Sequence, residues 1–300
     1  MTKARLLGGE QVRRIKDVHG SSTKWDLMAT LQPTTMPGET LKSEKMPGHW
    51  LLARLGKRVL RPGGRHLTVR MIETLNPLPS DEVIEFAPGL GETARLTLKR
   101  NPSSYMAVER DKDAGAIVQK FLQGERQRCV IGLAEQTGLP DTSATCVYGE
   151  AMLSMQTPDQ KARIVREAHR LLNLGGRYGI HELCLIPDDL DEKTKLAIQN
   201  ELASAVHHGT RPLTIAEWKG LLESEGFLVQ SLAQAPMHLL EHWRIIQDEG
   251  TFGALRFAFN VLCNREARRR VFAMREVFSK YREHLAAVMI VGQKKEKETQ

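Results

Sequence analysis

One stretch of the chain combines an acid with two closely spaced glycines: VIEFAPGLGETA, residues 83–94. A short apolar run carries Glu85, and the loop after it holds Gly89 and Gly91. Glycine permits left-handed backbone conformations and lets a ligand approach the bare main chain. Read as GxGxxA, Gly89, Gly91 and Ala94 also fit the dinucleotide-binding fingerprint. The loop is therefore a candidate cofactor site, and more than one cofactor class fits it.

The acid Glu85 helps to choose between those classes. A carboxylate this close to a bound pyrophosphate would repel it, whereas it suits a ligand that carries an ammonium group. S-adenosylmethionine has an α-amino group and no phosphate. Its ribose needs an acceptor for two hydroxyls, and Glu109 stands 18 residues after Gly91, at the end of a second apolar run. These residues favour S-adenosylmethionine.

Four blocks in order carry a family resemblance: VIEFAPGLGETA, YMAVERD, GLAEQTGLPD and LLNLGGRYGIHE. The chain resembles the class I S-adenosylmethionine-dependent methyltransferases, of the type that acts on small molecules. The resemblance covers roughly residues 78–233 and the last strand. It implies the following cofactor contacts: Glu85, Ala87, Gly89 and Gly91 at the methionine end, Glu109 on the ribose, and Ala134 and Glu135 near the adenine.

The sequence departs from the family pattern at two positions. Ala87 stands where the family often has a glycine, which is compatible with a negative φ at that residue. Leu133 stands where the family often has an aspartate that binds the adenine amino group. Two alternatives follow for the adenine: Glu135 makes that contact, or apolar packing holds the ring.

Candidate catalytic residues follow the fourth and fifth predicted strands. Tyr148 and Glu150 come at the end of the fourth strand, and His181 lies on the fifth. A histidine titrates near neutrality and is a candidate general base. A hydrogen-bonded structural histidine and a turn-capping glutamate are the alternatives. No metal site is expected, because the four cysteines are far apart, and we interpret them as buried, reduced thiols.

Strand-like and helix-like segments alternate from residue 82 onwards, which is typical of βαβ units. We expect an α/β fold: a Rossmann-like, seven-stranded, mostly parallel sheet with helices on both faces. In the family the last two strands form an antiparallel hairpin. The clearest helix is predicted over 157–176, with Thr157 as N-cap, Pro158 at the first position and glycines closing its end.

Two helical additions flank this domain. Residues 1–76 are predicted to form an N-terminal lid, and residues 77–300 the S-adenosylmethionine-binding domain. A helical cap is inserted at about 236–283. Candidate lining residues of an apolar pocket under the lid and cap are His49, Trp50, Trp243, Phe252, Phe257 and Phe259, and ordinary helix packing is the alternative for these side chains. Within the lid, Leu51, Leu52, Leu55 and Val59 share one face of a helix, whose basic residues are expected to be solvated.

The net charge of +7 belongs to the two ends of the chain. Residues 1–70 contain 14 lysines and arginines and 5 acids, and residues 241–300 contain 12 and 8. Basic ends leave two alternatives open: a nucleic-acid methyltransferase, or a lipid or quinone methyltransferase whose basic helix near 51–61 meets a membrane. The block of asparagine, two prolines and an aromatic residue that marks base-amino methylases is absent after the fourth strand.

The leading hypothesis is methyl transfer to a small acceptor by in-line displacement, with the acceptor held under the lid and cap. The acceptor atom stays open. We expect the acceptor to be anionic or partly apolar, with no stable nucleic-acid partner, no integral membrane association and a homodimer left open. No secretory signal or transmembrane run is recognisable, so a cytoplasmic location is expected.

Overall fold

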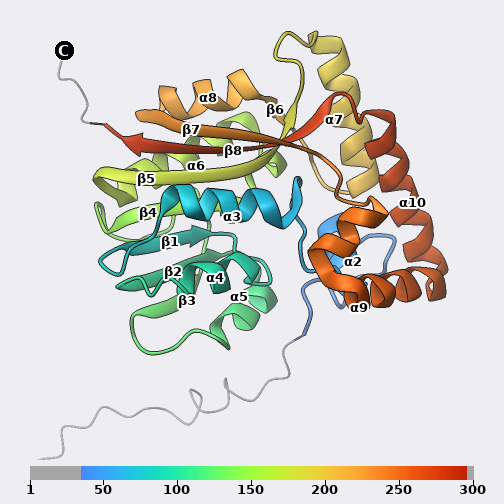
Figure 1. Ribbon diagram of the computed structural model, residues 1–300, viewed down its shortest axis with the longest axis horizontal. Coiled ribbons are helices and arrows are strands. Elements are labelled where there is room, and N and C mark those ends of the chain that lie inside the picture. Colours follow the sequence, from blue (N-terminus) through green and yellow to red (C-terminus); the bar gives the residue numbers. More distant parts are fainter. Residues whose placement is uncertain (1–34, 296–300) are drawn as a thin grey trace, which may run out of the picture. The chain divides into compact units, whose positions relative to one another are not determined.

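The computed structural model describes residues 35–295, which belong to one compact unit (Figure 1). The part of the predicted lid that precedes residue 35 lies outside the described residues. No helix between residues 35 and 295 is both long enough and apolar enough to cross a bilayer.

A central sheet organises the molecule. Its strands are β1 (Glu82–Phe86), β2 (Ser104–Glu109), β3 (Gln127–Ile131), β4 (Ala144–Glu150), β5 (Leu172–Leu185), β6 (Leu213–Thr214), β7 (Phe227–Pro236) and β8 (Leu285–Lys294). The order is β3-β2-β1-β4-β5-β8-β7, with the short β6 beside β5. β8 is antiparallel to both of its neighbours, and the other pairs are parallel. The predicted Rossmann-like sheet of seven strands, with its antiparallel end, is confirmed, and β6 adds a two-residue eighth strand.

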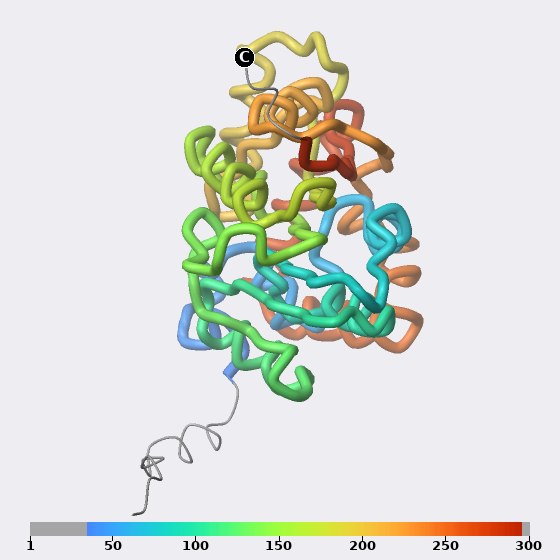
Figure 2. Tube along the Cα trace, turned by 90° about the vertical axis from the view of Figure 1, so that its left-hand side faces the viewer, coloured from blue at the N-terminus to red at the C-terminus, as the bar shows by residue number. Residues whose placement is uncertain are grey.

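Helices cover both faces of this sheet. α3 (Gly64–Leu75), α4 (Glu92–Leu98) and α5 (Lys112–Gln119) pack on one face, where they share a buried cluster with Val83, Tyr105 and Tyr148. α6 (Pro158–Leu171) and α8 (Ile215–Ser224) share the other cluster with Phe86 and Ile180. Figure 2 shows α3 in cyan and α6 in yellow-green on opposite sides. Successive side chains of a strand point to opposite faces of the sheet, and both faces are buried here. The strands therefore contribute apolar side chains to both clusters.

A third apolar core lies outside the sheet layers. It is formed by α2 (Gly48–Arg54), α7 (Glu192–Val206), α9 (His242–Cys263) and α10 (Arg265–Lys280), with the end of β5. In Figure 1 these helices gather at the side where the parallel strands end. The predicted insertion is therefore helical, but it packs on α2 and α7. The helix α3, which the sequence boundary at residue 76 assigned to the lid, is a layer of the sheet domain.

The insertion holds the segment after α2 in place. The α2 helix ends at Arg54, so Leu55 and Val59 do not continue a helical face as expected. Lys57 is fully buried, with its Nζ 3.3 Å from Asp248 Oδ2 and 3.7 Å from Glu249 Oε1. Glu249 Oε1 also accepts hydrogen bonds from the backbone N–H groups of Arg58 and Val59. Lys57 is thus not part of the solvated face that was expected but anchors the segment, whereas Arg58 is exposed.

Two local expectations need correction. The helix predicted over 157–176 has its Thr157 capping box and Pro158 start, but it ends at Leu171 and not at the glycines. Leu172 is already extended and pairs with Ala144 at the start of β5. Two of the four cysteines, Cys146 and Cys184, are buried as expected, whereas Cys129 is partly exposed and Cys263 is exposed. Cys263 is the last residue of α9, on a side of that helix that faces solvent. The apolar residues around it in the sequence had suggested that the thiol would be buried.

Replacing Thr214 by alanine should lower the free energy of unfolding by about 1 kcal/mol. Thr214 caps α8: its hydroxyl accepts from the Glu217 N–H, and the Glu217 side chain accepts from the Thr214 N–H. Ser224→Ala, an exposed change at the other end of α8, is the matched control and should cost a few tenths of that. Urea titration of both variants measures the difference, and equal stabilities would contradict the capping assignment.

Candidate functional site

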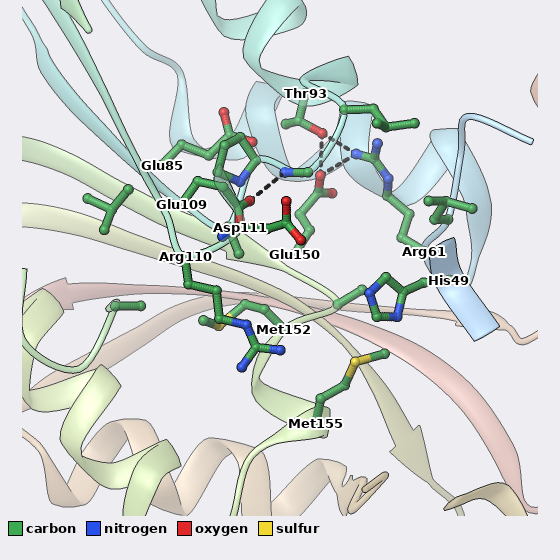
Figure 3. A pocket seen from close by; sticks show the side chains of 18 of the residues that line it. His49, Arg61, Glu85, Thr93, Glu109, Arg110, Asp111, Glu150, Met152 and Met155 are labelled. Atoms are coloured by element: carbon green, nitrogen blue, oxygen red, sulfur yellow. Dashed lines mark hydrogen bonds and ion pairs between the residues drawn. The ribbon is translucent and has the colours of Figure 1, made fainter. Parts of the chain in front are cut away.

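A cavity of about 240 Å³ opens at the carboxyl ends of β1, β2 and β4. The loop after β1, the end of β2, the loop after β3, the loop after β4 and the segment around α2 all contribute to its wall (Figure 3). In open parallel sheets this edge is where ligands bind, because neighbouring loops diverge there. The three apolar cores described above hold these loops and the α2 segment around this cavity.

The glycine loop forms one wall of the cavity. Gly89 has a φ of +57°, and a Cβ at that position would meet no atom within 4 Å, so the bare backbone faces open space. Gly91 has a φ of +76° and precedes α4, where a Cβ would lie 2.7 Å from Phe121 Cε1. Gly91 itself does not line the cavity; it lets the chain turn tightly into α4.

Ala87 has a φ of +51°, so the negative angle expected for an alanine here is wrong. Its backbone N–H donates to the carbonyl of Val108 across to β2, which holds the residue in the left-handed region. A left-handed alanine costs roughly 1–2 kcal/mol relative to its relaxed conformation. A glycine at this position would avoid that cost.

Glu85 lies at the base of the cavity and is almost completely buried. The hydroxyls of Tyr105 and Tyr148 both donate to its Oε2, the latter at 2.7 Å. Burial raises the pKa of Glu85 to about 7, and the two tyrosine hydrogen bonds only partly oppose that rise. A cation arriving in the cavity would therefore meet a carboxyl group that is ready to ionise near neutral pH.

Glu109 ends β2 and is held between two loops. Its Oε2 accepts from the Gly89 N–H at 3.1 Å, and its Oε1 accepts from the Asp111 N–H at 3.0 Å. Burial raises the pKa of this carboxyl group, against those two backbone hydrogen bonds. Each oxygen keeps acceptor capacity toward the cavity, which the side chain lines. Glu109 thus ties the glycine loop to the end of β2.

The wall near residues 133–135 is mostly apolar. Leu133 is half exposed, and Ala134 and Ile164 line the cavity beside it. The carboxylate of Glu135 is engaged by Arg163, whose Nε and Nη2 lie 2.9 and 2.8 Å from Oε2. Of the two alternatives left open by the sequence, this arrangement favours apolar packing of a ring over a contact with Glu135.

Glu150 is the centre of a buried polar cluster at the cavity floor. Its Oε2 meets the Arg61 guanidinium and the Thr93 hydroxyl (Figure 3). Its Oε1 accepts from the Thr68 hydroxyl at 2.6 Å and lies 2.8 Å from His181 Nδ1. Burial alone would raise the pKa of Glu150, but the charge of Arg61 and the bonds from His181 and Thr68 lower it to about 2. The carboxylate is therefore ionised, and its hydrogen-bonding capacity is already used.

His181 and Tyr148 do not line the cavity. His181 has no exposed surface; its Nε2 donates to the Pro62 carbonyl at 2.6 Å while its Nδ1 faces Glu150. Tyr148 is also fully buried, and its hydroxyl contacts Thr97 and Glu85. Of the three candidate catalytic residues, only Glu150 reaches the cavity wall.

Of the residues on the opposite wall, the sequence indicated only His49 and Trp50, as candidate lining of an apolar pocket; Arg58, Met152 and Met155 were not predicted. His49, Trp50 and Arg58 line the cavity from the α2 segment, and Met152 and Met155 line it from the turn after β4. Glu182 holds that turn, since its carboxylate accepts from the N–H groups of residues 152, 153 and 154. The available sequence signal was Glu182 itself, an acid within an apolar strand. Its position in the sequence did not reveal that it would hold residues 152–154, which lie about 30 positions earlier.

His49 is uncharged. Burial, together with the nearby His208 and Arg110, lowers the pKa of its ring to about 3. Its Nδ1 is buried and has no hydrogen-bond partner among the described residues. A buried polar nitrogen without a partner is costly, so a ligand in the cavity that donates a hydrogen bond to it would relieve that cost.

Comparison with known proteins places this site in a family. Residues 84–180 match the family described as a methyltransferase domain. A protein of Haemophilus influenzae of uncharacterised function is 32% identical over 231 residues, covering 75% of this chain and 90% of that protein.

Solved structures share the fold at low identity. Phosphoethanolamine N-methyltransferase 2 of Haemonchus contortus, in complex with S-adenosyl-L-methionine, has a TM-score of 0.63 at 13% identity, over 83% of this chain and 57% of that one. The [4+2]-cyclase SpnF has a TM-score of 0.63 at 15% identity, over 82% and 93%. Because a cyclase shares the architecture, the fold by itself does not define the reaction.

The domain match, the sheet order and the glycine loop agree. The chain carries a methyltransferase domain of the class I S-adenosylmethionine-dependent type. Members of this class take the transferred methyl group from S-adenosylmethionine.

Proposed function

We propose that this protein binds S-adenosylmethionine along the glycine loop and transfers its methyl group to a small, anionic acceptor. The observation that carries the proposal is the composition of one cavity. Glu85, Ala87, Gly89 and Glu109 line one part of it, and His49, Trp50 and Arg58 line another. A cofactor and an acceptor bound in these two parts would be neighbours.

The residues present fit the cofactor in their charge, their hydrogen-bond acceptors and their apolar surface. Glu85 offers a carboxylate to the α-ammonium group, Gly89 offers open backbone, and Glu109 offers acceptors to the ribose hydroxyls. Ala134 and Ile164 offer an apolar surface to the adenine. S-adenosylmethionine supplies a methyl group already activated by its sulfonium, so the protein's task is to align the acceptor and exclude water.

The charge of the acceptor is inferred from two arginines. Arg58 and Arg110 line the cavity, and neither side chain forms an ion pair within residues 35–295. Guanidinium groups bind carboxylates and phosphates through paired hydrogen bonds. We therefore assign them to an anionic group of the acceptor, while the uncharged His49 and the Trp50 ring orient the rest.

The earlier catalytic candidates take positioning roles in this proposal. Glu150, held by Arg61 and His181, fixes the floor of the cavity, and Tyr148 fixes Glu85. No base is assigned: an acceptor bound as a free amine or a thiolate attacks the methyl carbon with its own lone pair, the methyl–sulfonium bond breaks to release S-adenosylhomocysteine, and a methylated amine then loses its proton to solvent.

The test is a methyl-transfer assay with labelled S-adenosylmethionine and paired acceptors. Small amines and thiols with a carboxylate or phosphate group would be compared with their neutral esters or amides. The proposal predicts turnover of the anionic members and a loss of that preference in Arg58→Gln with Arg110→Gln. Equal turnover of the neutral members by the unaltered enzyme would contradict the anionic assignment.

Cofactor affinity should rise about eightfold between pH 6 and pH 7.5 as Glu85, with a pKa of about 7, loses its proton. The sign follows from the pairing: only the ionised carboxylate attracts the cofactor's ammonium group, so binding weakens below the raised pKa. Calorimetry with S-adenosylhomocysteine at several pH values measures this. Glu85→Gln is the control and should flatten the profile; an equally steep profile in that variant would assign the titration to another group.

A further inference from the structure

One side of α9 presents large apolar side chains to solvent. After Gly250, where the backbone departs from helical geometry, Phe252, Leu255, Phe259 and Leu262 are 88%, 68%, 66% and 62% exposed. Their spacing of three, four and three residues places them on one side of the helix. We call these four residues the α9 apolar face.

The opposite side of α9 is packed, so the orientation of the helix is fixed. Phe257 and Val261 are buried in the core that α9 shares with α2 and α10. Asn260 Nδ2 donates to the Leu55 carbonyl at 2.9 Å. The packed side therefore holds the α9 apolar face outward within residues 35–295, and exposed patches of this kind mark interaction sites.

The surroundings of this face are basic. Residues 250–265 contain no acid, and residues 251–275 contain six arginines and one glutamate. Arg256, Arg265 and Arg269 are exposed, and none of them forms an ion pair within the part of the chain that the structure describes. The partner must then offer apolar groups beside negative charge.

We propose that the α9 apolar face docks on an anionic phospholipid surface. Phenylalanine and leucine side chains would enter the boundary between headgroups and acyl chains, while the arginines bind lipid phosphates. Two copies of this chain paired through the same face would bring several arginines of each copy together, with Glu266 as the one acid among residues 251–275, which disfavours a dimer here. The inference does not depend on which acceptor the cavity takes.

The experiment is co-sedimentation of the full chain with phosphatidylcholine vesicles that contain or lack phosphatidylserine. Binding to the anionic vesicles is expected, with loss at high salt as the arginine contacts are screened. Phe252→Ser with Phe259→Ser should weaken binding roughly tenfold or more, and Arg256→Glu with Arg265→Glu should weaken it roughly fivefold per arginine.

Leu174→Ser is the matched control, because Leu174 is similarly exposed near the start of β5, outside α9. It should bind vesicles as the unaltered protein does. S-adenosylhomocysteine affinity, measured in each variant, separates a failure of the docking proposal from a failure of the cofactor assignment. Absence of vesicle binding, or binding unchanged by the α9 substitutions, overturns the proposal. So does a dimer that only the α9 variants dissociate, since it would make a second copy the occupant.

Discussion

Glu150→Ala should lower the free energy of unfolding by about 3–5 kcal/mol, because it breaks a buried ion pair. The carboxylate is the one buried anion between the Arg61 guanidinium and His181. Both ring nitrogens of His181 face oxygen atoms, one of the Pro62 carbonyl and one of the Glu150 carboxylate. Without Glu150 the Arg61 guanidinium in the cavity floor would lose its ion-pair partner, and the Thr68 and Thr93 hydroxyls would lose their acceptor.

Denaturant titration of Glu150→Ala beside Glu225→Ala measures this difference. Glu225 pairs with Arg166 at the surface, where the arginine is 65% exposed, and its loss should cost about 0–1 kcal/mol. Because its folded pKa is lowered to about 2, Glu150 contributes stability that is present above the unfolded value of 4.5 and lost as pH falls toward 2. Glu150→Gln should lose that acid sensitivity. Equal costs for the two alanine variants would contradict the buried cluster.

Glu109→Ala should weaken cofactor binding by about 1.5–3 kcal/mol, or roughly 10- to 150-fold, because a charged acceptor for two hydroxyls is removed. A secondary loss is expected, since the Gly89 N–H loses its partner and the glycine loop is less constrained. Calorimetric titration of Glu109→Ala with S-adenosylhomocysteine measures the loss of cofactor affinity.

The matched variant Glu109→Asp separates the two contributions. It keeps the negative charge and shortens the side chain by one methylene, so it should bind more tightly than Glu109→Ala and less tightly than the unaltered protein. Circular dichroism verifies that each variant is folded. An unchanged affinity in folded Glu109→Ala would place the ribose elsewhere in the cavity.

The sheet domain could be predicted from the sequence because its signals are local. Alternating strand and helix segments from residue 82 and the capping residues Thr157 and Thr214 each act over a few positions. The glycine loop was located for the same reason: its cofactor residues follow one another along β1 and its turn. Glu85, Gly89 and Glu109 all line the cavity that this reasoning placed at the strand ends.

The environment of the candidate residues could not be predicted, because it depends on contacts distant in sequence. His181 was read as a titrating group, but the carbonyl of Pro62 and the side chain of Glu150 enclose it. Lys57 was read as solvated, but Asp248, 191 positions later, buries it. Conversely, Phe259 was read as a lining of the cavity, and it faces solvent. Helical periodicity shows which apolar residues share one side of a helix, but it does not show whether another part of the protein covers that side.

The central claim is that the glycine-loop cavity binds S-adenosylmethionine, and calorimetry with S-adenosylhomocysteine and NADH tests it most directly. We predict binding of the sulfur compound at micromolar strength, about −8 kcal/mol, with no measurable heat from NADH. Binding of NADH without a response to S-adenosylhomocysteine or S-adenosylmethionine would contradict the account, and would return Gly89 and Gly91 to the dinucleotide fingerprint that they also fit.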